Sequence, residues 1–250
     1  QGWWGSDATC GRDHCCIKGR PRGSLPFPAN WTINMTSNNA AALLLPDRTT
    51  LVQFQPLVRC TPGSPILGLH FFLSIHPNIS ILGSGIWGAH GGSHLSSIGG
   101  TIREGELLPS APPIPHALKL MLWAEQYYWP GNATVPCFRW PATNCDGAWN
   151  ASRDPANANF YNGSDTRLKP GALLAVPPHT STTLLPLMQT EVGRRILVAL
   201  TDFGGYLDDN TASDSGAFNV EGGVIEEVKR AWHGLDLQRA HDGEPFYEDM

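Results

Sequence analysis

Short apolar stretches separated by glycine and proline run along most of the chain after residue 50. In residues 51–58 apolar and polar side chains alternate, and residues 65–75 form a longer apolar run of the kind found in buried strands. Shorter strand candidates are residues 79–82, 86–89, 97–103, 118–125 and 171–176. The pattern predicts short strands joined by turns, although 118–125 also contains strong helix formers.

Two segments have the spacing of an amphipathic helix. The first begins after Thr190, a good N-cap, and ends at Gly204 and Gly205. The apolar residues that share its face are Val192, Ile196, Ala199, Leu200 and Phe203. The second, weaker segment covers residues 224–232. Together with the strands, these segments predict an all-β fold, a jelly-roll-like β-sandwich with one or two peripheral helices.

The first 28 residues differ from the rest of the chain. They contain half of the cysteines and the pair Trp3-Trp4, and they show no sustained periodicity. We therefore expect two parts: an extended, disulfide-tied N-terminal arm at residues 1–28, and a β-sandwich domain at residues 29–250. The neighbouring indoles of Trp3 and Trp4 need a dry pocket, either on their own domain or on the next subunit.

Charge is sparse in this chain. Charged residues make up 16% of it, the net charge is −5, and no block of lysine and arginine occurs, so nucleic acid is not an expected partner. No apolar run reaches the roughly 18 residues that span a bilayer, so no membrane span is expected. The chain opens at Gln1 without a leader-like segment, and we expect a signal peptide to have been removed.

Six cysteines suit three disulfide bonds in an oxidising compartment. We expect Cys137 to pair with Cys145 across a proline-containing turn. Cys15 and Cys16 are neighbours, so we send them to different partners, with Cys10 and Cys60 among the possibilities. A zinc site would need paired cysteine or histidine spacings that are missing, so no metal is expected.

The glycosylation sequence Asn-x-Ser/Thr occurs six times, against about two expected by chance. The asparagines are Asn30, Asn34, Asn78, Asn132, Asn150 and Asn162. The excess predicts covalent N-glycans on solvent-facing turns and a secreted, extracellular protein. The alternative is that these residues are turn formers and nothing more.

A glycine-rich segment supplies the first catalytic candidates, His90 and His94, with Arg103 and His116 further along. A histidine that abstracts a proton beside a uronate, and an arginine that neutralises the carboxylate, would suit a polysaccharide lyase. The alternative is that His and Ser stabilise glycine-rich turns. Gly91 and Gly92 argue against the helix that would direct both histidines at a metal.

A second set of candidates is acidic: Asp202, Asp208 and Asp209 lie in a run that ends near Asp214. Two such carboxyl groups can act as the acid and base of a glycosidase, or bind Ca²⁺. The alternative is a solvated acidic loop after a helix. No nucleotide-binding or other cofactor motif is present in the sequence, so no cofactor is expected. The nine tryptophans can serve a sugar-binding module, although tryptophan is more often core or interface.

Residues 51 to about 214 resemble a group of secreted bacterial proteins with a GAHGGS-x-LSSIGGTIR motif. The residues that carry the resemblance include Val52–Pro56, Gly88–Gly92, Leu95–Arg103 and Arg139–Ala142. The resemblance implies no established activity and therefore assigns no catalytic role. The cysteine-rich arm and most sequons lie outside it or depart from it.

These observations favour a secreted, N-glycosylated structural protein. We expect copies of it to assemble head-to-tail into an extracellular fibre or matrix through the arm, without catalysis. The alternatives are a carbohydrate-active enzyme, either a polysaccharide lyase or a glycosidase, and a sugar-binding module.

Overall fold

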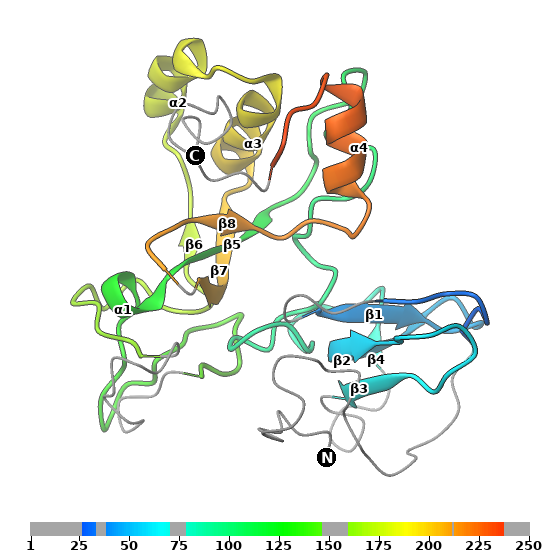
Figure 1. Cartoon of the computed structure of the whole chain (residues 1–250). Helices are drawn as coiled ribbons and strands as arrows, with labels where there is room; N and C mark the ends of the chain where they lie inside the picture. The colour runs from blue at the N-terminus through cyan, green and yellow to red at the C-terminus, as the bar shows by residue number, and fades with distance from the viewer. Residues whose placement is uncertain (1–26, 34–38, 71–78, 147–159, 212, 238–250) are drawn as a thin grey trace. The chain divides into compact units, whose positions relative to one another are not determined.

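The computed structural model describes residues 27–33, 39–70, 79–146, 160–211 and 213–237 (Figure 1). The chain divides into an N-terminal unit, Gln1–Ile98, and a C-terminal unit, Gly99–Met250. The arm expected at residues 1–28 lies outside the described residues except for Phe27 and Pro28. Also outside them are Trp3, Trp4, Cys10, Cys15, Cys16, Asn34, Asn78 and Asn150.

One antiparallel sheet forms the N-terminal unit. Its strands are β1 (Ala41–Leu44), β2 (Thr50–Val58), β3 (Leu67–His70) and β4 (Ile79–Ser80). The central strand β2 pairs with the other three, and Ala41 lies opposite Phe54 in the β1–β2 register. The alternation predicted for 51–58 is confirmed as a strand, and Val52, Phe54 and Leu57 form its buried apolar cluster.

The C-terminal unit contains a second sheet with strand order β6-β7-β5-β8 (Figure 1). Its strands are β5 (Leu118–Trp123), β6 (Leu173–Leu174), β7 (Gly205–Thr211) and β8 (Ala217–Phe218). Strand β5 is parallel to β7 and antiparallel to β8. Parallel neighbours need a crossover connection, and helices α2 (Pro178–Leu184) and α3 (Glu191–Asp202) lie in the segment that leads from β6 to β7.

Helices supply much of the core of this unit. Helix α3 begins where Thr190 accepts a hydrogen bond from the Gly193 amide at 2.9 Å, as the sequence predicts for an N-cap. Helix α4 (Val224–Ala231) confirms the second predicted helix. Buried residues of both helices pack with Leu118 of β5 in one cluster: Val192, Ile196, Ala199, Val224 and Val228.

The predicted all-β, jelly-roll-like sandwich is therefore wrong. The described residues form two small sheets with helices α1 (Ala124–Tyr127), α2, α3 and α4, and a short 3₁₀ turn at Leu185–Leu187. The predicted strands at 86–89 and 97–103 contain no strand; the single bridges near them are His90 to Leu95 and Ile102 to Val220. Strand β7 was not predicted: the acidic segment, for which a solvated loop was the alternative interpretation, is an inner strand of the C-terminal sheet.

No helix among the described residues is long and apolar enough to cross a membrane.

Two of the expected disulfide features are present in the structure. Cys137 and Cys145 are bonded to each other, as the sequence predicts, and Cys60 is disulfide-bonded as well.

Candidate functional site

Three polar side chains meet on one face of the C-terminal sheet. Strand alternation turns Lys119 to the face opposite Leu118 and Leu120, which belong to the apolar clusters. The Lys119 Nζ atom lies 3.6 Å from Oδ2 of Asp208 in the neighbouring strand β7. The same Oδ2 accepts a 3.1 Å hydrogen bond from Nδ2 of Asn219, which follows β8. We call Lys119, Asp208 and Asn219 the polar triad.

Burial dominates the electrostatics of the triad. The side chains of Lys119 and Asp208 are 2% and 0% exposed, and Asn219 is half-buried. Burial lowers the pKa of the Lys119 ammonium below its ordinary value, and the attraction of Asp208 and Asp209 opposes that shift without cancelling it. The lysine is therefore closer to its neutral amine than a surface lysine is.

The next residue of β7, Asp209, is fixed through its backbone. The Tyr128 hydroxyl donates to the Asp209 carbonyl at 2.6 Å and accepts from the Leu122 amide at 3.2 Å. Tyr128 is completely buried, and this burial raises the pKa of its phenol. Its ring meets that of Tyr161 edge-on at 5.2 Å between centroids. The end of β5 is thereby tied to β7.

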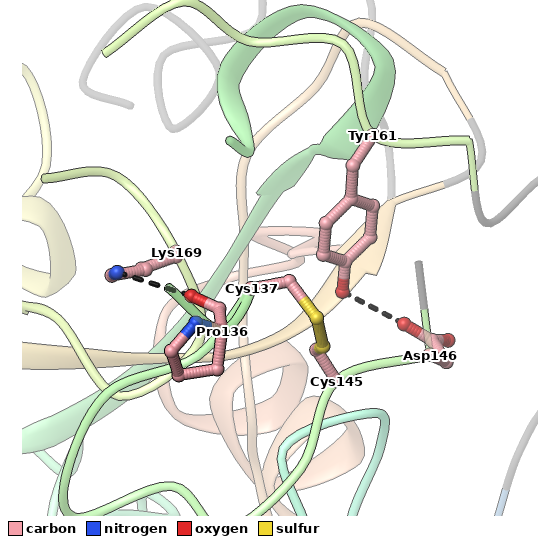
Figure 2. The surroundings of a disulfide bond; sticks show 6 residues. All are labelled: Pro136, Cys137, Cys145, Asp146, Tyr161 and Lys169. Carbon is pink, nitrogen blue, oxygen red and sulfur yellow. Dashed lines mark hydrogen bonds between the residues drawn. A yellow bond between two sulfur atoms is a disulfide. The ribbon is translucent and has the colours of Figure 1, made fainter. Parts of the chain in front are cut away.

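A disulfide bond lies beside Tyr161 (Figure 2). The Cys137–Cys145 bond closes a short loop, and next to it Asp146, which follows Cys145, accepts a 2.7 Å hydrogen bond from the Tyr161 hydroxyl. Lys169 donates to the Pro136 carbonyl at 3.2 Å, and its Nζ lies 4.7 Å from the ring centre of Trp129. The loop that precedes Cys137 is held at both ends by these contacts.

That loop carries one of the sequons. The Asn132 side-chain Oδ1 accepts hydrogen bonds from the amide and hydroxyl of Thr134, at 2.9 and 3.0 Å, and from the Val135 amide at 2.8 Å. Gly131 at φ 77° allows the tight turn, because a Cβ there would lie 2.7 Å from the Cys137 nitrogen. Asn132 is exposed, as are Asn30 and Asn162, the other two sequon asparagines that the structure describes.

Two buried glutamines of β2 hold the glycine-rich segment in the N-terminal unit. Gln53 donates to the Trp87 carbonyl at 3.1 Å and accepts from the Ser97 amide at 2.6 Å. Gln55 accepts from the Gly91 amide at 2.5 Å. Gly88 lies so close to the backbone of Leu95 and Ser96 that a Cβ would overlap with it. The glycines and serines of this segment therefore have a demonstrable structural role.

The histidine candidates lie in different surroundings. His90 is buried and bridges to Leu95, whereas His94 occupies the left-handed region at φ 57°, and burial lowers its pKa. In the C-terminal unit, Nε2 of His116 lies 3.1 Å from a Glu106 carboxylate oxygen, and Nδ1 lies 2.9 Å from the Ala117 carbonyl. Arg103 is exposed. The structure thus gives His116 a carboxylate partner that the sequence did not single out.

The acidic candidates are separated by their elements. Asp202 is exposed at the C-terminal end of α3, whereas Asp208 and Asp209 are buried in β7. Asp208 meets Lys119 and Asn219 rather than a second catalytic carboxyl in the contacts described above. Neither partner was among the site residues predicted from the sequence. The alternating pattern of residues 118–125 places Lys119 between apolar residues of a strand. A lysine at such a position is the feature of the sequence that could have indicated a buried acidic partner.

Among the residues that the structure describes, no group of three or more His, Cys, Asp and Glu side chains is arranged to hold a metal ion. Comparison of the chain with protein-family models, curated proteins and solved structures found no match.

Proposed function

We propose that this chain is a secreted, N-glycosylated structural protein that assembles head-to-tail into an extracellular fibre through its N-terminal arm. The observation that carries the proposal is the surface around Asn132. There an exposed sequon, held by its own threonine, lies next to the Cys137–Cys145 disulfide. Disulfides persist in oxidising compartments, where N-glycans are also added, so the two features point to the same cellular route.

One of the two remaining disulfides connects the arm to the folded part in this proposal. Cys60 directly follows β2 and its single-residue bridge at Arg59, and it is disulfide-bonded. Because Cys137 and Cys145 use each other, the cysteines left as partners for Cys60 all belong to residues 1–28. A covalent anchor of this kind would hold the arm near the N-terminal sheet and shorten the reach of Trp3 and Trp4.

Assembly is driven in this proposal by the two tryptophans. Burying an indole removes a large apolar area from water, so adjacent indoles on an arm favour insertion into a pocket of a neighbouring copy. A head-to-tail contact that does not close into a ring extends into a filament. The exposed sequons, Asn30, Asn132 and Asn162, would carry hydrophilic glycans that keep such a filament dispersed.

Two variants of the full chain test the assembly step. Light scattering of the secreted protein is expected to show growth with concentration, and Trp3→Ala with Trp4→Ala is expected to abolish that growth. Trp140→Ala is the matched control, because Trp140 is 71% exposed and lies outside the arm. Equal scattering from wild-type and double-variant protein, with no growth in either, would refute the fibre.

The secretory step is tested separately by mass. Treatment of the secreted protein with an amidase that removes N-glycans is expected to lower its mass and convert the occupied asparagines to aspartate. A protein whose mass does not change after this treatment would contradict the glycoprotein assignment whatever its state of assembly.

A further inference from the structure

The polar triad brings an amine, a carboxyl group and a carboxamide together inside the C-terminal unit. In the antiparallel register, Leu120 pairs with Phe218 and Met121 with Ala217, so Lys119 and Asn219 are the next cross-strand pair. Their backbones are in contact as well, since the Asn219 amide donates to the Lys119 carbonyl at 3.3 Å. Directly opposite residues have Cβ atoms about 4.5–5.5 Å apart, which is within the reach of a lysine side chain.

Asp208 touches the reactive ends of both side chains. Its Oδ2 lies 3.6 Å from Lys119 Nζ and 3.1 Å from Asn219 Nδ2. A carboxyl group placed between an amine and an amide can accept a proton from one and pass it to the other. Gly100 adds to the fit, because a Cβ at its position would lie 2.8 Å from the Lys119 Cγ. The sequence therefore leaves room for the lysine stem.

We propose that Lys119 and Asn219 form an intramolecular isopeptide bond, and that Asp208 transfers the protons of this reaction. A lysine becomes a nucleophile when its surroundings favour the neutral amine, and desolvation provides such surroundings. The lowered pKa of Lys119, caused by its burial, agrees with this role. The reaction needs residues of the C-terminal unit alone, so it is independent of the fibre proposed above.

The chemistry balances without an oxidant, a reductant or a cofactor. The Lys119 ammonium passes a proton to Asp208, and the neutral Nζ attacks the Asn219 Cγ. A bond forms between Nζ and Cγ, and the bond between Cγ and Nδ2 breaks. Two protons lost by Nζ are delivered through Asp208 to the departing nitrogen, which leaves as ammonium. The products are a secondary amide that joins the two side chains and one ammonium ion.

Asn219 is a better acceptor than Asp208 in this arrangement. Condensation of Lys119 with Asp208 would release water and would need a second group to move the protons. The adjacent carboxyl, Asp209, accepts a 2.9 Å hydrogen bond from the Asn210 amide through its Oδ1. The mass of the product distinguishes the two reactions, because one loses ammonia and the other loses water.

The test uses the full secreted chain after disulfide reduction and removal of N-glycans. Proteolysis and tandem mass spectrometry are expected to give one branched peptide in which Lys119 and Asn219 are joined, lighter by one ammonia than the sum of its parts. Mapping the loss to this peptide is necessary because an N-terminal glutamine also loses ammonia when it cyclises. Trypsin is expected not to cleave after Lys119.

Asp208→Ala and Asn219→Ala are expected to yield the two peptides unlinked, with trypsin cleaving after Lys119. Asp214→Ala is the matched control, since Asp214 is exposed, and it is expected to retain the bond. Unlinked peptides from the wild-type protein would overturn the proposal, and so would a branched peptide lighter by water. The presence or absence of the branched peptide in the wild-type protein tests the isopeptide bond even if a triad variant does not fold.

Discussion

The Tyr128 hydroxyl donates a 2.6 Å hydrogen bond to the backbone carbonyl of Asp209, inside a part of the C-terminal unit where the tyrosine has no exposed surface. The same oxygen accepts from the Leu122 amide, so one phenol satisfies polar groups of β5 and β7 together. A backbone group that loses its partner in such a place has no water to replace it.

Tyr128→Phe is therefore expected to lower the free energy of unfolding by about 1–3 kcal/mol, because it removes hydrogen bonds to the buried Asp209 carbonyl and from the partly buried Leu122 amide while preserving the ring. Urea unfolding followed by fluorescence measures the change. Tyr206→Phe is the control, since Tyr206 is partly exposed, and it is expected to change little. Equal stability of both variants and the wild type would show that the hydroxyl contributes nothing.

The parts of the fold that could be predicted from the sequence are those whose signal is local. Thr190 and the apolar spacing after it predict helix α3 because capping and amphipathicity act within a few residues. The alternation at 51–58 predicts β2 for the same reason. Cys137 and Cys145 are eight residues apart, so their pairing also needed no knowledge of distant contacts.

The rest depends on pairing between distant segments. Strand β7 has the sequence Gly-Tyr-Leu-Asp-Asp-Asn-Thr, and two adjacent aspartates are typical of a solvated loop. In the structure it is an inner strand, and the Asp208 carboxyl contacts Lys119, 89 residues earlier, and Asn219. The polar triad could not be predicted for the same reason, because its three residues come from different strands or strand ends that are far apart in the sequence.

The buried Gln53 of β2, which holds the glycine-rich segment by hydrogen bonds, gives a second stability test. Gln53→Leu keeps the volume of the side chain but removes the hydrogen bond to the Trp87 carbonyl and the hydrogen bond from the Ser97 amide. We expect the free energy of unfolding to fall by about 1–3 kcal/mol through the loss of these hydrogen bonds, and limited proteolysis between residues 87 and 97 to be faster. Gln126→Leu, at an exposed position of α1, is expected to leave both unchanged. Unaltered proteolysis of the Gln53 variant would contradict the structural role of this glutamine.

Asp47 provides a pH test at a single group. The Thr50 hydroxyl and the amides of Thr49 and Thr50 lower the pKa of Asp47 to about 2. A lowered carboxyl pKa stabilises the folded state above the unfolded value of about 3.9, and this contribution is lost as the pH falls toward about 2. Thr50→Val is expected to raise the Asp47 pKa, measured by NMR of the carboxyl carbon.

The control for that titration is Asp165, whose pKa is also about 2, through hydrogen bonds from Arg167. It is expected to titrate identically in wild-type and Thr50→Val protein. An Asp47 that still titrates near 2 without the hydroxyl would show that the backbone amides alone determine its pKa.

Glycan occupancy at Asn132 is testable with three substitutions. Asn132→Gln and Thr134→Ala are each expected to remove one glycan, because Asn132 is exposed and the sequence rule for attachment requires both residues. Thr134→Ser keeps a hydroxyl at that position and is expected to retain the glycan. The measurement is the mass of the secreted protein before and after enzymatic glycan removal. Equal mass loss in all three variants and the wild type would show that this asparagine is unoccupied.

Electron microscopy of the native protein tests the central claim most directly. The account predicts filaments of repeating subunits at high protein concentration, and their absence from protein in which Trp3 and Trp4 are both alanine. Dispersed particles of a 27.1 kDa chain with its glycans, under the same conditions and in both proteins, would contradict it.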